Sequence, residues 1–132
     1  MAGERDLERL LATMEPELQP GRYVFTTVAE VPVDCDPVVL VREAEGTTLV
    51  LEQEEADGLG LPYEYVATMI SLRVHSALDA VGLTAAVAAV LAEAGMSCNV
   101  VAGYYHDHLF VPYERGAEAV GLLRVRRSSP SS

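Results

Sequence analysis

The stretch that decides the fold runs from residue 65 to residue 95 and reads YVATMISLRVHSALDAVGLTAAVAAVLAEAG. Residues 65–74 place a β-branched or aliphatic side chain at every second position, which predicts a long β-strand. Residues 83–94 are rich in alanine and carry their larger apolar side chains on one stripe, which predicts an α-helix that stops at Gly95.

The chain after Gly95 continues with two strands and a helix. We expect strands at residues 97–103 and 108–111, separated by a turn around His106 and Asp107, and a helix over residues 114–124. Residues 65–124 therefore spell β-α-β-β-α. A further strand from the first half of the chain would complete β-α-β-β-α-β, the ferredoxin-like order, so the predicted fold class is α+β.

The first half of the chain has shorter elements. The apolar spacing predicts a helix over residues 6–14, and turn-bounded apolar segments predict strands at 23–28, 38–41 and 47–52. The segment at 38–41 is continuously apolar, which is typical of a buried strand. No long crossover helix is present, so a second copy of the same unit would be degenerate.

These segments predict three regions. A degenerate N-terminal half covers residues 1–62, a C-terminal domain covers 63–125, and a polar tail at 126–132 is expected to be disordered.

Charge and hydropathy narrow the possible partners. The chain has 132 residues, 20 of them acidic and nine basic, for a net charge of −11, and every basic residue is an arginine. This balance argues against nucleic acid, because most of the surface would repel phosphates. Apolar runs are too short for a transmembrane helix and no signal peptide is evident, so we expect a cytoplasmic protein that does not bind membranes.

The sequence contains none of the catalytic motifs that we searched for. The nucleophile-elbow, phosphate-loop and zinc-protease motifs are all missing from the sequence, which argues against an enzyme. Cys35 lies between two aspartates, where a thiolate is disfavoured, and Cys98 reads as a small core residue. His106 and His108 invite a metal hypothesis, but the predicted turn falls on them, so we expect no metal and no cofactor.

Residues 74–112, VHSALDAVGLTAAVAAVLAEAGMSCNVVAGYYHDHLFVP, resemble ACT domains. These are small regulatory modules with the β-α-β-β-α-β fold, and they are best known for binding amino acids. The whole chain resembles stand-alone proteins with two ACT-like units, which are similar to the regulatory region of aspartate kinases and to the cytosolic arginine sensors of animals.

The resemblance implies a ligand at the helix start and at the beginning of the next strand, usually between two units. By position, the first segment is Val81, Gly82, Leu83 and Thr84, and the second is Cys98, Asn99 and Val100. A helix start holds a carboxylate on its free N–H groups, and glycine admits the ligand to the backbone.

Three side chains near this site leave alternatives open. Aspartate kinases have an aspartate where Asn99 stands, and it pairs with the ligand amine. The neutral Asn99 therefore either weakens amine binding or leaves the charge to another acid such as Asp79. Ser76 either donates to the ligand or satisfies its own loop.

Two functions follow from these observations. The first is a non-enzymatic regulatory protein that binds an amino acid or a similar small carboxylate, forms a homo-oligomer, expected as a dimer, and acts in trans on an unidentified protein. The alternative is an interaction module that oligomerises or docks on a partner without a ligand.

Overall fold

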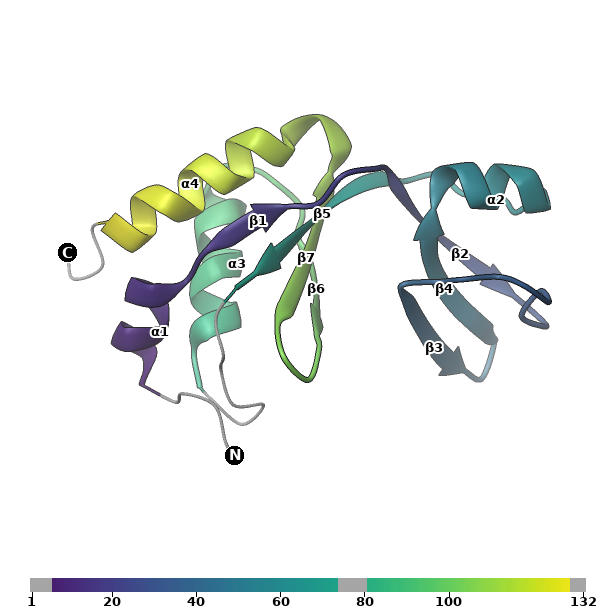
Figure 1. Ribbon diagram of the computed structural model, residues 1–132, viewed down its shortest axis with the longest axis horizontal. Helices are drawn as coiled ribbons and strands as arrows, with labels where there is room; N and C mark the ends of the chain where they lie inside the picture. The colour runs from purple at the N-terminus through teal and green to yellow at the C-terminus, as the bar shows by residue number, and fades with distance from the viewer. Residues whose placement is uncertain (1–5, 74–80, 129–132) are drawn as a thin grey trace.

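The computed structural model describes residues 6–73 and 81–128, with the backbone alone for 126–128 (Figure 1). In chain order its elements are α1 (Leu7–Thr13), β1 (Pro16–Leu18), β2 (Tyr23–Val28), β3 (Val39–Glu43), β4 (Gly46–Glu52), α2 (Gln53–Leu59), β5 (Val66–Leu72), α3 (Leu83–Glu93), β6 (Asn99–Ala102), β7 (Asp107–Pro112), the 3₁₀ turn η1 (Tyr113–Arg115) and α4 (Gly116–Ser128). None of the described helices is both long and apolar enough to cross a membrane.

Strand β5 is the centre of one antiparallel sheet with the order β3-β4-β2-β5-β7-β6. One edge of β5 has two successive partners. Its first residues pair with β2, at Val24↔Val66, and its later residues pair with β1, at Leu18↔Ile70. The other edge pairs with β7 from Ala67 to Leu72. Two ferredoxin-like units therefore share this strand.

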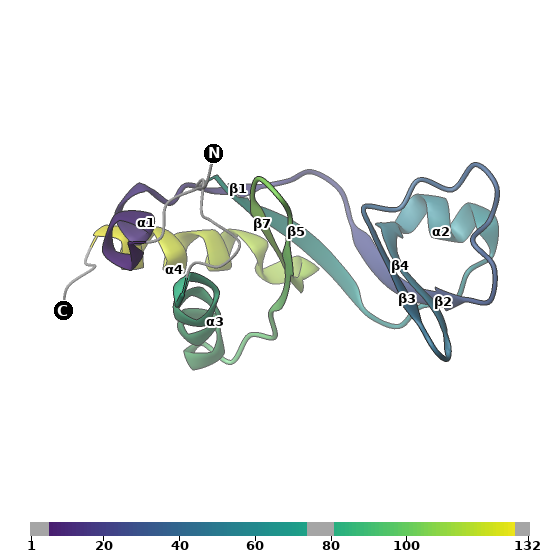
Figure 2. The ribbon, with the colours of Figure 1, turned by 90° about the horizontal axis from the view of Figure 1, so that it is seen from below.

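The second unit contains β5, α3, β6, β7 and α4, with β1 as its last strand. Its strand order, β1-β5-β7-β6, confirms the prediction that the first half supplies the missing strand of the ferredoxin-like fold. Helix α1 also belongs here, because it contacts both α3 and α4 (Figure 2).

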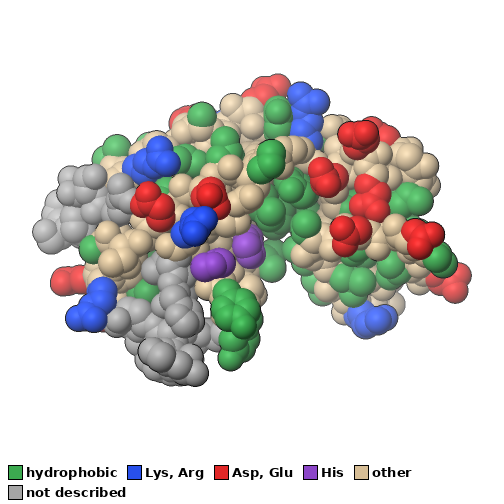
Figure 3. Space-filling model, viewed as in Figure 1, with side chains coloured by type: hydrophobic (Ala, Val, Ile, Leu, Met, Phe, Trp, Pro, Cys, Tyr) green, Lys and Arg blue, Asp and Glu red, His purple; other side chains and the backbone are tan. Residues whose placement is uncertain are grey.

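The first unit contains β2, β3, β4, α2 and the start of β5, in the order β3-β4-β2-β5. Residues 29–38 are a loop where the second unit has helix α3. Val31 and Cys35 of this loop pack, together with α2, against the core of the sheet. The unit is acidic, since residues 19–61 carry nine acidic residues and two arginines, and acidic side chains gather over α2 and the neighbouring strands (Figure 3).

The main core lies between the sheet of the second unit and its helices. Its fully buried side chains come from α1 and the residue that follows it, β5, α3, β7 and α4, and they include Leu10, Met14, Ile70, Leu72, Leu91, Leu109 and Leu123. The opposite sheet face, here called the open face, is covered by none of the described helices (Figure 2). It holds an aromatic cluster in which the Phe110 ring lies edge-on to Tyr23 and Phe25, with centroids 6.1 and 5.5 Å away.

The observed elements differ from the predicted ones in three places. Strand β3 was expected to be buried, but it is the edge of the sheet, and Leu40 and Val41 are 41% and 46% exposed. The predicted turn around His106 and Asp107 is displaced: the Gly103 N–H donates to the carbonyl oxygen of His106, which closes the turn over residues 104–105, and Asp107 already lies in β7. The backbone of α4 continues through Ser128, so the first three residues of the expected tail are helical.

The division of the chain at residue 62 stays a prediction. The structure adds that residues 7–18 pack with the second unit, although they stand at the other end of the sequence.

We expect Leu10→Ala to lower the free energy of unfolding by about 2–5 kcal/mol, because it leaves a cavity in the main core. Leu40→Ala removes the same atoms from the exposed edge strand and should cost below about 1 kcal/mol. Urea denaturation of both variants measures the difference. Equal, small losses would show that α1 does not dock on the second unit.

Candidate functional site

The start of α3 offers free backbone N–H groups. Gly82 is its N-cap residue, in the left-handed conformation with φ of 100°, and no side chain among the described residues caps the helix. The first turn contains no acidic residue. The first N–H groups of a helix have no acceptor within it and carry partial positive charge. This terminus can therefore hold a carboxylate without a basic side chain.

Helix α1 lies directly against this terminus. A Cβ atom added at Gly82 would lie 3.1 Å from Cδ2 of Leu7. Glycine is thus required twice at this position, by the positive φ and by the close approach of Leu7. The sequence indicated Leu7 only as part of an amphipathic stripe, so its contact with the predicted site was missed.

The first predicted segment presents mainly backbone to a ligand. Val81 is 82% exposed, whereas Leu83 is 3% exposed and belongs to the main core. Thr84 is exposed on the first turn of α3. Ser76 and Asp79 lie outside the described residues.

The second predicted segment lies at the far end of α3. Residues 94–98 connect the end of α3 to β6, so Asn99 follows the C-terminal end of the helix while Gly82 precedes its N-terminal end (Figure 1). The helix has 11 residues, which separates the two ends by about 16 Å. One chain therefore does not bring Gly82 and Asn99 together.

Asn99 and its two neighbours in the sequence point to opposite faces of the sheet. Cys98 and Val100 pack against the main core, and Asn99 is exposed beside Phe110 on the open face. Burial raises the pKa of the Cys98 thiol. The pKa of Cys35 is also raised, by burial and by the nearby Glu55 and Asp36, so neither thiol is an activated nucleophile.

The histidine segment forms no metal centre in the part of the chain that the structure describes, where no group of three or more His, Cys, Asp and Glu side chains converges. His106 precedes β7, and the side chain of His108 instead meets Ser71, with 2.8 Å between Nδ1 and the hydroxyl oxygen. His108 thus belongs to a polar contact between strands.

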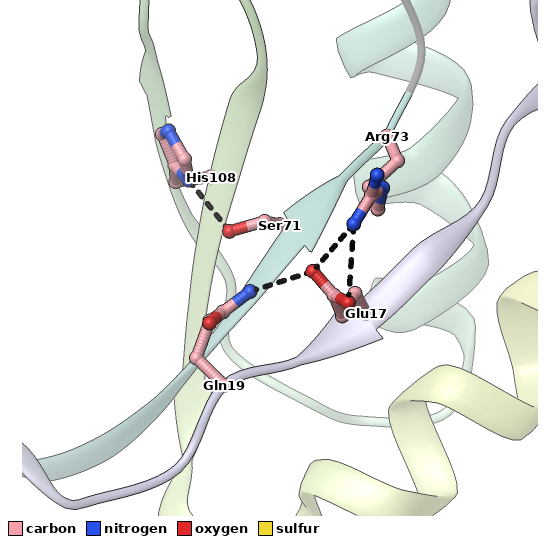
Figure 4. A network of polar contacts seen from close by, with 5 residues as sticks. All are labelled: Glu17, Gln19, Ser71, Arg73 and His108. Atoms are coloured by element: carbon pink, nitrogen blue, oxygen red, sulfur yellow. Dashed lines mark hydrogen bonds and ion pairs between the residues drawn. The ribbon is translucent and has the colours of Figure 1, made fainter.

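A polar stripe crosses the open face of the second unit (Figure 4). Ser71 and His108 face each other from β5 and β7, and beside them the guanidinium of Arg73 lies 3.3 Å from the carboxylate of Glu17 on β1. Gln19 donates a hydrogen bond to the same carboxylate. These contacts tie β1 to β5, although an ion pair this exposed contributes little stability.

Burial lowers the pKa of His108, and the nearby His106 lowers it further, against the opposing effect of Asp107. The pKa of the Asp107 carboxyl is raised by burial, against the opposing effect of the two histidines. The folded protein therefore favours a neutral imidazole at His108.

We expect His108 to titrate below its ordinary value of 6.5, as measured by NMR of the imidazole C–H signals. The unfolded chain then binds more protons below pH 6.5, so this residue makes folding stability fall as the pH drops. Spectra of His106→Asn and His108→Asn assign the signals. A midpoint at or above 6.5 for His108 would contradict its burial.

Comparison with known proteins decides the family. One family model, described as ACT domain, matches residues 2–68, and a second with the same description matches residues 64–125. The chain belongs to the ACT domain family. The resemblance inferred from the sequence is thereby confirmed for both halves, and the two matches overlap at the start of β5, the strand that both units share.

Several solved structures share the fold of this ACT-domain chain. A Vibrio cholerae protein of unknown function, described as a possible transport protein, is 49% identical, with a TM-score of 0.83 over 92% of this chain and 95% of its own. An Agrobacterium tumefaciens protein is 17% identical, with a TM-score of 0.68 over 86% and 89%. The ligand-free regulatory subunit of aspartate kinase from Thermus thermophilus is 8% identical, with a TM-score of 0.58 over 83% and 95%. No curated protein matches the chain.

Proposed function

We propose that this ACT-domain protein is a non-catalytic regulator that binds a small molecule, an amino acid or a similar carboxylate, at the start of α3. It acts in trans on another protein, in the cytoplasm. The observation that carries the proposal is the first turn of α3 behind Gly82, which no side chain of the described residues caps and which offers N–H groups and partial positive charge in a chain of net charge −11.

The family matches support the regulatory role. ACT domains are typically regulatory ligand-binding modules, and the two matches together extend over residues 2–125. The Thermus thermophilus structure of similar fold is a regulatory subunit. A ligand regulates by binding one arrangement of the units more tightly than another, with a coupling of about 1–3 kcal/mol.

The placement of Asn99 favours a site made by two copies. Gly82 and Asn99 stand at opposite ends of α3, so a ligand that touches both would use Gly82 of one copy and Asn99 of another. A homodimer supplies two such sites by symmetry. This arrangement makes ligand binding and dimer formation depend on each other.

Gly82→Asp should weaken binding of an amino acid at least tenfold relative to Gly82→Asn, because only the aspartate places negative charge at the helix start. The asparagine variant is the matched control, since both side chains meet Leu7 and both tolerate positive φ better than most residues. A thermal-shift panel of the twenty amino acids finds the ligand, and calorimetry compares the variants. Equal affinity of two folded variants would remove the site from Gly82.

Mixing two defective variants tests the shared site. Gly82→Asp and Asn99→Leu should each bind poorly alone, while an equimolar mixture that is allowed to exchange subunits should recover about a quarter of the sites. The recovered sites combine an intact Gly82 with an intact Asn99 from different copies. Calorimetry counts the sites, and no recovery in a mixture shown to exchange subunits would overturn the two-copy arrangement.

The alternative, an interaction module without a ligand, is favoured by one observation. Tyr104 and Tyr105, at the tip of the β6–β7 hairpin, are 71% and 67% exposed, with ring centroids 5.1 Å apart. Exposed aromatic side chains are common at protein interfaces. A stable oligomer in light scattering together with a flat thermal-shift panel would select this function.

A further inference from the structure

A pocket, here called the junction pocket, lies where the two units meet, and none of its lining residues belongs to the site at Gly82. It has a volume of about 460 Å³ and receives Arg22 and Gln53 from the first unit and Tyr113, Glu114 and Arg115 from the segment after β7. In Figure 1 the chain that leads from β1 to β2 passes between α2 and the turn into α4 at this place. The volume is in the usual range for small-molecule sites.

Arg22 is the free cation of this pocket. Its guanidinium carbon lies 4.4 Å from the centroid of the Tyr113 ring. Arg22 makes no ion pair with any described residue, although the chain has 20 acidic residues, whereas Arg73 and Arg115 each pair with a glutamate. A guanidinium that lies over an aromatic ring keeps its in-plane N–H groups available.

The second arginine of the pocket is already engaged. Arg115 donates to both carboxylate oxygens of Glu118 and to the carbonyl oxygens of Ala94 and Gly95 at the end of α3. These bonds hold the η1 turn, and with it Tyr113, in place. The pKa of Arg115 is raised by its hydrogen bond to Glu118. Arg115 therefore supports the pocket, and Arg22 remains to bind an anion.

On the side of the first unit, a hydrogen bond to Gln53 fixes the backbone of Arg22. The backbone N–H of Gln53 donates to the carbonyl oxygen of Arg22 at 2.8 Å, and the Gln53 side chain donates to the hydroxyl of Tyr63 at 3.0 Å. The backbone of Arg22 is thus fixed to the start of α2, while its side chain reaches across to the second unit.

We infer that this junction pocket binds a small carboxylate, whose two oxygens take the in-plane N–H groups of Arg22. Bidentate pairing with carboxylate is the strongest use of a guanidinium. Glu114 lines the same pocket, so a ligand that also carries an amine is favoured over a dianion. The residues of this site are separate from those at Gly82, and the inference does not depend on the proposed function.

The test is calorimetric titration with the twenty amino acids and with acetate and succinate. At least one of these carboxylates should bind the wild-type chain, and Arg22→Gln should weaken that carboxylate at least tenfold. Arg42→Gln is the matched control, because it removes one exposed arginine from β3, outside the pocket, and should leave the affinity within twofold.

Gly82→Asp separates this inference from the proposed function. A carboxylate that binds at the junction pocket should bind Gly82→Asp and wild type equally. A carboxylate that binds at the start of α3 should lose affinity in Gly82→Asp and keep it in Arg22→Gln. Equal affinity of wild type and Arg22→Gln for every carboxylate that binds would overturn the inference, as would a panel in which none binds. Circular dichroism and the melting temperature confirm that each variant is folded.

Discussion

The double use of strand β5 is the constraint on which the rest of the structure depends. One edge of this strand is divided between β2 and β1. The start of β5 completes the sheet of the first unit, and the rest of β5 belongs to the sheet of the second unit. Pairing of β1 at Leu18↔Ile70 carries α1 onto the helices of the second unit. The main core, in which Leu10 of α1 and Leu72 of β5 are both fully buried, therefore combines residues from both ends of the sequence.

The same constraint shapes both candidate sites. Docking of α1 sets Leu7 against Gly82 and so narrows the approach to the first turn of α3. At the other end of the shared strand, the step from β1 to β2 places Arg22 opposite Tyr113. Both sites are therefore made by contacts between residues far apart in the sequence. Each depends on how the segment before β2 is placed against the second unit.

Local elements with strong periodicity could be predicted from the sequence. The strand at 23–28 and the helix from Leu83 have the predicted start, because side-chain alternation and alanine content are properties of neighbouring residues. The need for one strand from the first half was predicted from the element order. Its identity was not, because Pro16–Leu18 is too short to show alternation and gains its partners only from β5.

The parts that could not be predicted depend on long-range placement. The segment at 38–41 is apolar enough for a core strand, but its position at the sheet edge is set by pairing with β4 alone. Position-by-position transfer from the family brought Gly82 and Asn99 into one site, whereas the length of α3 separates them within a chain. Arg22 gave no sequence signal, since its environment is an aromatic ring some ninety positions away.

The shared strand also decides what can be inherited or engineered as a piece. A gene fragment for the first unit alone would lack the rest of β5, and one for the second unit alone would lack β1 and its helix. Neither fragment encodes all the strands of its own unit, so we expect the two units to fold together only when both are present. Two separately expressed fragments have a reason to find each other, which makes this chain a natural scaffold for a split reporter.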